Sequence, residues 1–245
     1  MGLLLRLIVL LSIAAGACLP AWALDLQRRR MMTAAEQKPW RGVGRLDVKN
    51  QFSEGMCTGT LIAEDLVLTA AHCVTSELTG LIIPPDGVEF IAGERLGVSA
   101  GKSKAARIAV HPSYDAGRSG VGLSIRYDMA LVRLEKPIPK ARAPYFAIAP
   151  TPDLDAALTL ISYRRDRTSG LTRQDGCTIT TVVDAVMTLG CDVTFGASGS
   201  SFFQIIDGEP HVVAVLSAME GGAAKPVAYA VTVESAMAEV LAELD

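Results

Sequence analysis

Residues 191–200 read CDVTFGASGS, a run of small residues in which Ser198 stands between Ala197 and Gly199. The glycines of this run allow a tight turn, so that a serine hydroxyl can be presented while neighbouring N–H groups point at the same spot. A serine nucleophile that attacks a carbonyl group has these requirements. Small residues also surround serines in ordinary turns, so the hypothesis that Ser198 is the nucleophile needs a base and an acid elsewhere.

Two upstream stretches supply these groups. Residues 57–62 read CTGTLI and residues 67–73 read VLTAAHC, a β-type run that ends in a small-residue turn with His72 beside Cys73. Residues 127–134 read YDMALVRL and place Asp128 directly before an apolar strand. We predict that His72 is the base and Asp128 the acid; the alternative acid, Asp115, lies in a Gly-rich turn.

The three motifs together resemble those of the trypsin-like (chymotrypsin-fold, S1-type) serine peptidases, and in particular their secreted bacterial branch related to the glutamyl endopeptidases. The chain order His, Asp, Ser is the order of that family and differs from the order in subtilisins and α/β-hydrolases. The resemblance extends from about residue 40 to the C-terminus. It implies a serine endopeptidase that hydrolyses peptide bonds through an acyl-enzyme.

Many short apolar runs separated by Gly, Pro, Asn and Asp favour an all-β fold without any reference to a family. The expected strands cover residues 43–48, 60–69, 87–92, 105–110, 129–134, 158–162, 177–183, 185–189, 201–206, 211–217 and 227–231. The resemblance adds their arrangement, which is two six-stranded antiparallel β-barrels with the active site between them. Apolar residues at helical spacing over residues 233–244 predict a C-terminal helix packed on the second barrel.

The 245 residues, of which 50% are hydrophobic and 20% charged, suit one or two packed cores. We expect a signal peptide at 1–23, because a positive charge, an apolar stretch and the small-x-small pattern at 21–23 follow one another. The other expected segments are a short N-terminal extension or propeptide at 24–39, an N-terminal barrel at 40–135, a linker at 136–149, and a C-terminal barrel with its helix at 150–245. The basic run 28–30 is either a solvated tail or a processing site within that propeptide.

The net charge of −3 gives no electrostatic reason to bind nucleic acid or an anionic membrane. From the predicted signal peptide we expect a secreted or periplasmic protein without a stable membrane anchor after signal cleavage. We also expect it to be a monomer and, as the resemblance implies, to act on polypeptides. No cofactor is expected. A metal site is not expected either, since the cysteines lack the close pairing that zinc usually requires.

Four cysteines remain once the signal peptide is removed, and they allow three pairings in an oxidising compartment. We predict Cys57 with Cys73, as the resemblance also implies, and Cys177 with Cys191, which would staple a hairpin leading to the nucleophile loop. Each pair closes a loop of ~15 residues, for which a stabilisation on the order of 3 kcal/mol is expected.

The resemblance also assigns further roles around the predicted triad. The N–H groups of Gly196 and Ser198 form the oxyanion hole, and Ser217 contacts both the acid and the substrate backbone. Asp192 lies at the count where trypsin carries the acid of its primary pocket, which favours a basic P1 residue. Bulky Met219 and Val227 near the pocket wall favour a small or medium P1 residue instead, and the sequence leaves both open.

Ala197 replaces the aspartate that pairs with the newly freed N-terminus in animal trypsin-like zymogens. We therefore expect a cleft that forms without such a switch. The alternative to an active peptidase is a catalytically inactive homologue that serves as a binding module, which intact His72, Asp128 and Ser198 argue against.

Overall fold

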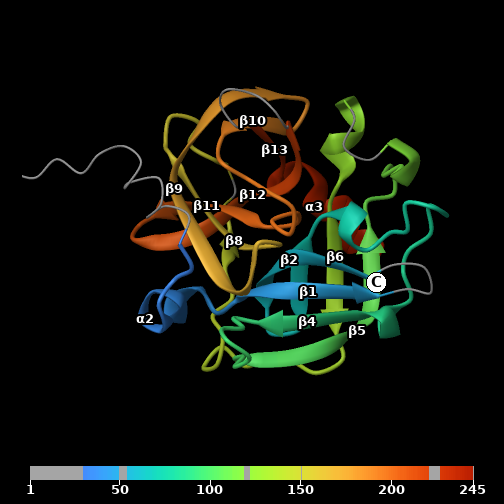
Figure 1. Ribbon diagram of the computed structural model, residues 1–245. Coiled ribbons are helices and arrows are strands. Elements are labelled where there is room, and N and C mark those ends of the chain that lie inside the picture. Colours follow the sequence, from blue (N-terminus) through green and yellow to red (C-terminus); the bar gives the residue numbers. More distant parts are fainter. Residues whose placement is uncertain (1–29, 50–53, 119–121, 150, 221–226, 245) are drawn as a thin grey trace, which may run out of the picture.

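The computed structural model describes residues 30–49, 54–118, 122–149, 151–220 and 227–244. Two β lobes lie side by side, and helix α3 lies between them on one side (Figure 1). The expected signal peptide at 1–23 and the first residues of the expected extension at 24–39 lie outside the described residues. In the part of the chain that is described, none of the helices combines the length and the apolar character that crossing a bilayer requires.

The first lobe is a closed antiparallel barrel of six strands, in the order β1-β2-β3-β6-β5-β4, with β4 pairing back to β1. Its strands are β1 (Val43–Lys49), β2 (Glu54–Ala63), β3 (Leu66–Thr69), β4 (Val88–Ala92), β5 (Gly101–Val110) and β6 (Ala130–Leu134). The single strand expected at 60–69 is wrong. Residues 64 and 65 turn the chain there, so that β2 and β3 form a hairpin with Thr60 opposite Leu68.

The second lobe contains the remaining seven strands, in the order β11-β8-β9-β10-β13-β12-β7. They are β7 (Ala147–Ile148), β8 (Leu158–Arg164), β9 (Arg167–Val183), β10 (Val186–Gly190), β11 (Ser201–Ile206), β12 (Glu209–Glu220) and β13 (Val227–Thr232). An additional pairing of β11 with β12 makes the sheet barrel-like. The all-β class is confirmed, and the difference from six strands is β7, which joins β12 in parallel.

Helices are few and short. They are α2 (Ala34–Gln37) and α3 (Val233–Ala242), with the 3₁₀ turns η1 (Lys38–Trp40), η2 (Ala71–Cys73), η3 (Pro85–Gly87), η4 (Ala116–Arg118) and η5 (Gly122–Tyr127). The predicted C-terminal helix is confirmed, but it packs on both lobes. Its buried Val233, Ala236 and Val240 belong to the same apolar cluster as Ile108 of β5. The backbone carbonyl of Glu243, just after the helix, accepts a hydrogen bond from Arg107 on β5.

Three aromatic side chains join the N-terminal segment, the connection between the lobes and the second lobe. The Trp40 ring lies 5.7 Å from that of Phe146 and 5.1 Å from that of Phe203, measured between centroids, and the latter two are 4.9 Å apart. All three side chains are buried. Aromatic pairs in stacked and edge-on arrangements contribute about 0.5–1.5 kcal/mol each beyond their buried area, so this cluster helps to fix the lobes together.

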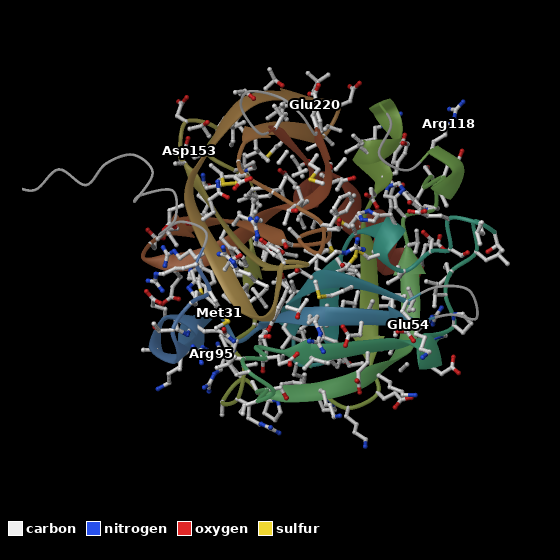
Figure 2. The ribbon with its side chains drawn as sticks, in the orientation of Figure 1. Met31, Glu54, Arg95, Arg118, Asp153 and Glu220 are labelled. Atoms are coloured by element: carbon white, nitrogen blue, oxygen red, sulfur yellow. A yellow bond between two sulfur atoms is a disulfide. The ribbon has the colours of Figure 1, made fainter. Side chains whose placement is uncertain are left out.

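Residues 30–40 contact both lobes. The Gln37 amide nitrogen donates to the Gly93 carbonyl at 2.8 Å, and its amide oxygen accepts from the Leu171 N–H of β9 at 3.1 Å. The backbone N–H of Met32 donates to the Leu171 carbonyl at 2.8 Å, and Arg95 Nε donates to the Met32 carbonyl. Figure 2 shows Arg95 and the neighbouring Met31 at one corner of the molecule.

Both predicted disulfides are present. Cys57 and Cys73 join β2 to η2 across a Cα–Cα distance of 6.1 Å. Cys177 and Cys191 join β9 to the start of the loop that precedes Ser198, across 4.9 Å. Each bridge therefore fixes an element that adjoins one of the predicted catalytic residues.

Candidate active site

His72 lies in η2, directly after β3, and Asp128 holds both its backbone and its ring. The His72 backbone N–H donates to Asp128 Oδ1 at 2.8 Å, and ring Nδ1 lies 2.7 Å from Oδ2. We assign the proton to Nδ1 from this pairing, because a carboxylate only accepts. The neutral ring then leaves Nε2 free to accept a proton, as a general base must.

Asp128 lies at the end of η5 and is 1% exposed. Ser217 Oγ also donates a hydrogen bond to its Oδ2. Burial raises the pKa of Asp128, but the attraction and hydrogen bonds of His72 and the Ser217 hydroxyl outweigh it, so the net pKa lies below its ordinary value. The structure thus places a carboxylate anion against the imidazole.

The same pair shifts the base in the other direction. Burial lowers the pKa of His72, whereas the charge and hydrogen bond of Asp128, with a smaller contribution from Glu77, raise it above its ordinary value. The His72 side chain is still 17% exposed. An imidazolium that forms during a reaction would therefore be stabilised by a neighbouring anion.

Ser198 lies in the loop between β10 and β11, where two glycines have positive φ angles. Gly196 has φ +89° and Gly199 has φ +77°, which side chains other than glycine rarely adopt. A Cβ on Gly199 would lie 2.2 Å from Thr69 Oγ1 and 3.1 Å from the backbone nitrogen of Ala70. Glycine therefore lets the nucleophile loop pack directly on the end of β3, next to the turn that carries the histidine.

Strand β12 connects the nucleophile loop to the acid. The Gly199 N–H donates to the Leu216 carbonyl at 2.9 Å, and the Leu216 N–H donates to the Ser200 carbonyl at 2.8 Å. The next residue is Ser217, whose hydroxyl binds Asp128. The structure therefore brings the four predicted residues His72, Asp128, Ser198 and Ser217 to one place from both lobes.

The expected oxyanion donors are the backbone N–H groups of Gly196 and Ser198. Within the described residues, neither N–H donates to another backbone carbonyl, whereas Ala197 N–H between them donates to the Thr194 carbonyl at 3.1 Å. Two N–H groups of the turn are therefore available to an oxygen atom of a ligand. Ala197 is itself buried.

The proposed nucleophile Ser198 and the proposed base His72 are not hydrogen-bonded to each other in this structure. Over the described ranges, no hydrogen bond joins Ser198 Oγ to His72 Nε2, and Nε2 lies 3.7 Å from Cys73 Sγ. Catalytic hydrogen bonds are often long in enzymes without substrate and tighten in the complex. The acid–base pair is thus assembled, with the serine loop beside it.

Asp192 and Met219 lie in the second lobe near this loop. Asp192 is half-buried, one residue after Cys191. Met219 packs on the apolar cluster that contains Cys191 and faces Ala228 on β13, while Val227 faces Glu220. Because side chains alternate along a strand, Met219 and Val227 point to opposite faces of the sheet. Of these two residues, Met219 is the one that packs on the cluster with Cys191, before Ser198.

A cavity of about 1110 Å³ opens on the first lobe, between the ends of β1 and β2 and the segment that follows η2. Its lining mixes charged and apolar side chains, among them Lys49, Glu54, Met56 and Ile82. None of the predicted catalytic residues lines it. Met56 links it to the site, since its Cε lies 2.5 Å from the position of a Cβ on Gly196.

Cys57, His72 and Cys73 each place a potential metal-ligand atom within 4.8 Å of the others. Cys57 and Cys73 are joined as a disulfide, so neither offers the thiolate that a zinc site uses. The remaining imidazole is already paired with Asp128. This cluster therefore does not have the donor set of a metal site.

Thr58 is a residue of the candidate site that none of the sequence motifs indicates. This β2 residue is fully buried, and it hydrogen-bonds to the nucleophile loop through both its backbone and its hydroxyl. Its side chain reaches Gly196, which is 138 positions away in the chain. The sequence places Thr58 and Thr60 on the same face of a strand, but it does not indicate that the Thr58 hydroxyl binds the Gly196 carbonyl.

The family model described as Trypsin matches residues 31–239, which is most of the chain. The chain belongs to this family of serine proteases. The match agrees with the resemblance found in the motifs.

Curated relatives match over parts of their length. The chain is 30% identical over 113 residues to the Limulus clotting factor C of Carcinoscorpius rotundicauda, covering 43% of this chain and 10% of that protein. It is 34% identical over 104 residues to chymotrypsin-like elastase family member 1 of Bos taurus, covering 42% of this chain and 36% of that protein. The chain thus spans about a third or less of these relatives.

Solved structures share the fold. The protease Anisep from Arthrobacter nicotinovorans has a TM-score of 0.67 at 17% identity, covering 85% of this chain and 98% of its own. A Glu endopeptidase solved in complex with MPD has a TM-score of 0.69 at 17% identity, covering 88% of this chain and 96% of its own.

Proposed function

We propose that this protein is a secreted serine endopeptidase with the triad Ser198, His72 and Asp128. The observation that carries the proposal is the pairing of Asp128 with both the backbone and the ring of His72, directly beside the loop that presents Ser198. The fold alone does not require a carboxylate at this buried position, because an apolar residue could fill it. The carboxylate suits a base that must be oriented and must carry a transient charge.

In the proposed reaction, Ser198 Oγ attacks the carbonyl carbon of a peptide bond while His72 Nε2 takes its proton. The oxygen that becomes negative is bound by the N–H groups of Gly196 and Ser198. His72 then gives the proton to the leaving amine, which departs and leaves an acyl group on Ser198. A water molecule, deprotonated in turn by His72, releases the acid and restores the serine.

The substrate is a polypeptide, and we propose that its leaving-group side extends toward the cavity on the first lobe. Met56 both lines that cavity and abuts Gly196, so a chain that leaves the reaction centre in this direction meets the cavity first. The exposed Leu81 and Ile82 at its edge offer apolar contacts to an extended peptide. No cofactor or metal takes part in the proposed reaction.

The P1 preference has two candidates. A basic residue is favoured by the carboxylate of Asp192 before the nucleophile loop, and a small or medium residue by Met219, which packs beside Cys191. Peptide libraries that vary P1 alone would separate them, because cleavage after Arg or Lys supports the first and cleavage after Ala or Val the second.

Secretion is part of the proposal. Two disulfides are typical of an oxidising compartment, which agrees with the signal peptide predicted at 1–23. We also propose that activity needs no ion pair between a cleaved N-terminus and the loop. Ala197 offers no carboxylate, and residues 31–40 are already hydrogen-bonded to β9 and to residues 93–95.

One observation favours a second candidate, a catalytically inactive homologue that acts as a binding module. In the described part of the chain, Ser198 Oγ and His72 Nε2 are not hydrogen-bonded. If that separation persists when a peptide binds, proton transfer cannot occur and the cleft would only bind peptides.

Hydrolysis of fluorescently labelled casein by residues 24–245, produced with both disulfides formed, tests the proposal. We expect release of labelled peptides by the wild type and loss of at least about 10³-fold with Ser198→Ala or His72→Ala. A folded wild type that binds casein without cleaving it would support the binding module instead.

A further inference from the structure

Thr58 on β2 is connected to the nucleophile loop at two points. Its backbone N–H donates to the Ser198 carbonyl at 2.9 Å, and its Oγ1 donates to the Gly196 carbonyl at 2.9 Å. The residue is fully buried, so water does not compete for either bond. Along the chain, the Ser198 N–H, one of the proposed oxyanion donors, lies between these two carbonyls, and the Gly196 N–H, the other donor, directly precedes the Gly196 carbonyl.

The direction of the Thr58 hydroxyl is fixed by its neighbours. Oγ1 accepts a hydrogen bond from the Tyr163 N–H at 3.0 Å, which leaves its own proton for the Gly196 carbonyl. The Thr58 carbonyl accepts from Thr69 Oγ1 at 3.0 Å, near the end of β3. The polar atoms of Thr58 are therefore all hydrogen-bonded, to the nucleophile loop, to β3 and to β8.

These contacts determine where the loop N–H groups point. A peptide unit is planar, so a carbonyl held at one end of a unit sets the plane of the N–H at its other end. The Gly196 carbonyl fixes the unit that ends in the Ala197 N–H, and this unit lies between the unit that carries the Gly196 N–H and the unit that carries the Ser198 N–H. The Ser198 carbonyl fixes the next unit, so the unit that carries the Ser198 N–H has an anchored unit on either side and little freedom to rotate.

The loop has a matching support from the second lobe. The Arg165 N–H, in the turn after β8, donates to the Phe195 carbonyl at 2.8 Å. A Cβ on Gly196 would lie 2.8 Å from that same backbone nitrogen, so the turn packs directly on the loop. Because Thr58 also binds Tyr163 at the end of β8, its hydroxyl joins β2, β8 and the loop at one point.

We propose that Thr58 is a positioning residue: its hydroxyl holds the Gly196 carbonyl, in the peptide unit between the two donor units, and so keeps the N–H groups of Gly196 and Ser198 in the geometry that binds the oxyanion. This inference rests on the proposed function. In this chain the neutral, buried hydroxyl takes over the support that an ion pair at position 197 cannot give, since Ala197 has no carboxylate. Thr58 does not touch the substrate and acts only through the loop.

The test compares Thr58→Ala with Thr58→Ser, two variants that differ by a single oxygen atom. Thr60→Ala is the matched control, because Thr60 is equally buried on the same face of β2 and its hydroxyl partner is Ser201, outside the turn. The readouts are the rate constant for labelling by a fluorophosphonate probe, kcat and KM on labelled casein, and the unfolding temperature. The phosphoryl oxygen of the probe occupies the oxyanion position, so the labelling rate reports on its donors.

We expect Thr58→Ala to lower the labelling rate and kcat by about 10-fold with KM little changed, less than the ~100-fold that a 1 Å misplacement can cause. Thr58→Ser should restore both to within about 2-fold of the wild type. Thr60→Ala should lower the unfolding temperature without slowing labelling at temperatures where it is folded. If Thr58→Ala does not fold, Thr58→Val, which fills the volume without a hydroxyl, takes its place with the same expectation.

Labelling of Thr58→Ala at the wild-type rate would overturn the inference and leave the proposed function intact. Equal losses in Thr58→Ala and Thr60→Ala would also overturn it, because they would indicate a general effect of buried hydroxyls on the fold. A folded wild type that the probe does not label would overturn the proposed function, and this inference with it.

Discussion

At the scale of single residues, the proposed chemistry depends on the charge that Asp128 places beside His72. This charge raises the pKa of the imidazole above its ordinary value of about 6.5, while His72 and the Ser217 hydroxyl hold the pKa of Asp128 below its ordinary value and keep its carboxylate ionised. A general base works only in its neutral form. The proposed activity is therefore linked directly to the titration of His72.

We expect kcat/KM for casein to rise with pH and to reach half its plateau above about pH 6.5. Stability should change in the opposite direction, because the folded state binds the His72 proton more tightly than the unfolded chain does. The stability that protonated His72 contributes is fully present below the pKa of His72 in the unfolded chain, and it is lost as pH rises through the pKa of His72 in the folded protein. A pH–rate profile measured beside urea unfolding at each pH checks both signs, and a midpoint clearly below 6.5 would contradict the assignment.

Replacing Asp128 with asparagine tests the role of the acid without changing its size. An asparagine amide that donates to Nδ1 forces the proton onto Nε2, so the base faces the serine in the wrong tautomer. We expect kcat to fall on the order of 10⁴-fold, as in other Ser-His-Asp triads. Circular dichroism should show an unchanged fold, and retention of more than a tenth of the wild-type rate would argue for a different acid.

At the scale of elements, β12 hydrogen-bonds to two parts of the candidate site. Through Leu216 it holds the nucleophile loop, and through Ser217 it holds Asp128. Two residues further along, Met219 packs on the cluster around Cys191. The strand therefore connects the proposed catalytic groups with the proposed wall of the P1 pocket.

Substitution of Met219 by glycine should enlarge that pocket. Each methylene removed from an apolar pocket changes discrimination by about 1–3 kcal/mol, so we expect the cleavage ratio of Phe over Ala at P1 to rise at least about 10-fold. Val227→Gly is the control, because Val227 faces the other side of the sheet from Met219. Equal changes in both variants, measured with peptides that differ only at P1, would contradict the proposed wall.

Strand positions show how far the sequence predicts elements. Residues 201–206 match β11 at both ends, because turn residues flank them on either side. The run 60–69 predicts one strand because apolar residues lie on both sides of Glu64 and Asp65, whereas these two residues form the turn between β2 and β3. The parallel pairing of β7 with β12 had no local signal, as it joins residues more than 60 positions apart.

At the scale of the whole molecule, the site depends on keeping two lobes in register. His72 and Asp128 come from the first lobe, and Ser198 and Ser217 from the second. The lobes are joined by the aromatic cluster around Trp40, by helix α3, and by residues 30–40. The described part of the segment predicted to be a short N-terminal extension or propeptide at 24–39 therefore has contacts that span both lobes.

Gln37→Ala should measure this connection. It removes buried hydrogen bonds to the Gly93 carbonyl and the Leu171 N–H, leaving both groups without their partner. An unsatisfied buried group costs about 1–3 kcal/mol, so we expect the free energy of unfolding to fall by about 2–4 kcal/mol. Urea denaturation checks this. Glu36→Ala, which disrupts the exposed capping box of the same helix, should lower the free energy of unfolding by less than Gln37→Ala does.

The sequence predicted the local parts of the site better than its long-range supports. The three motifs indicate His72, Asp128 and Ser198 as candidates because each lies in a recognisable short pattern, whereas the cysteine count leaves three pairings open and the two disulfides were chosen among them with the help of the family resemblance and the expected hairpin. Thr58 and Gln37 were missed, since their partners Gly196 and Leu171 lie 138 and 134 positions away. Contacts of this kind depend on the closure of the barrels, which no local pattern encodes.

Covalent labelling by a fluorophosphonate, followed by peptide mass analysis, shows whether Ser198 is an activated nucleophile. We predict one adduct, on Ser198, which forms on the folded wild type, is lost on unfolding, and is absent in His72→Ala. An adduct on another serine, or a folded protein that does not react, would contradict the proposal that Ser198 is the nucleophile.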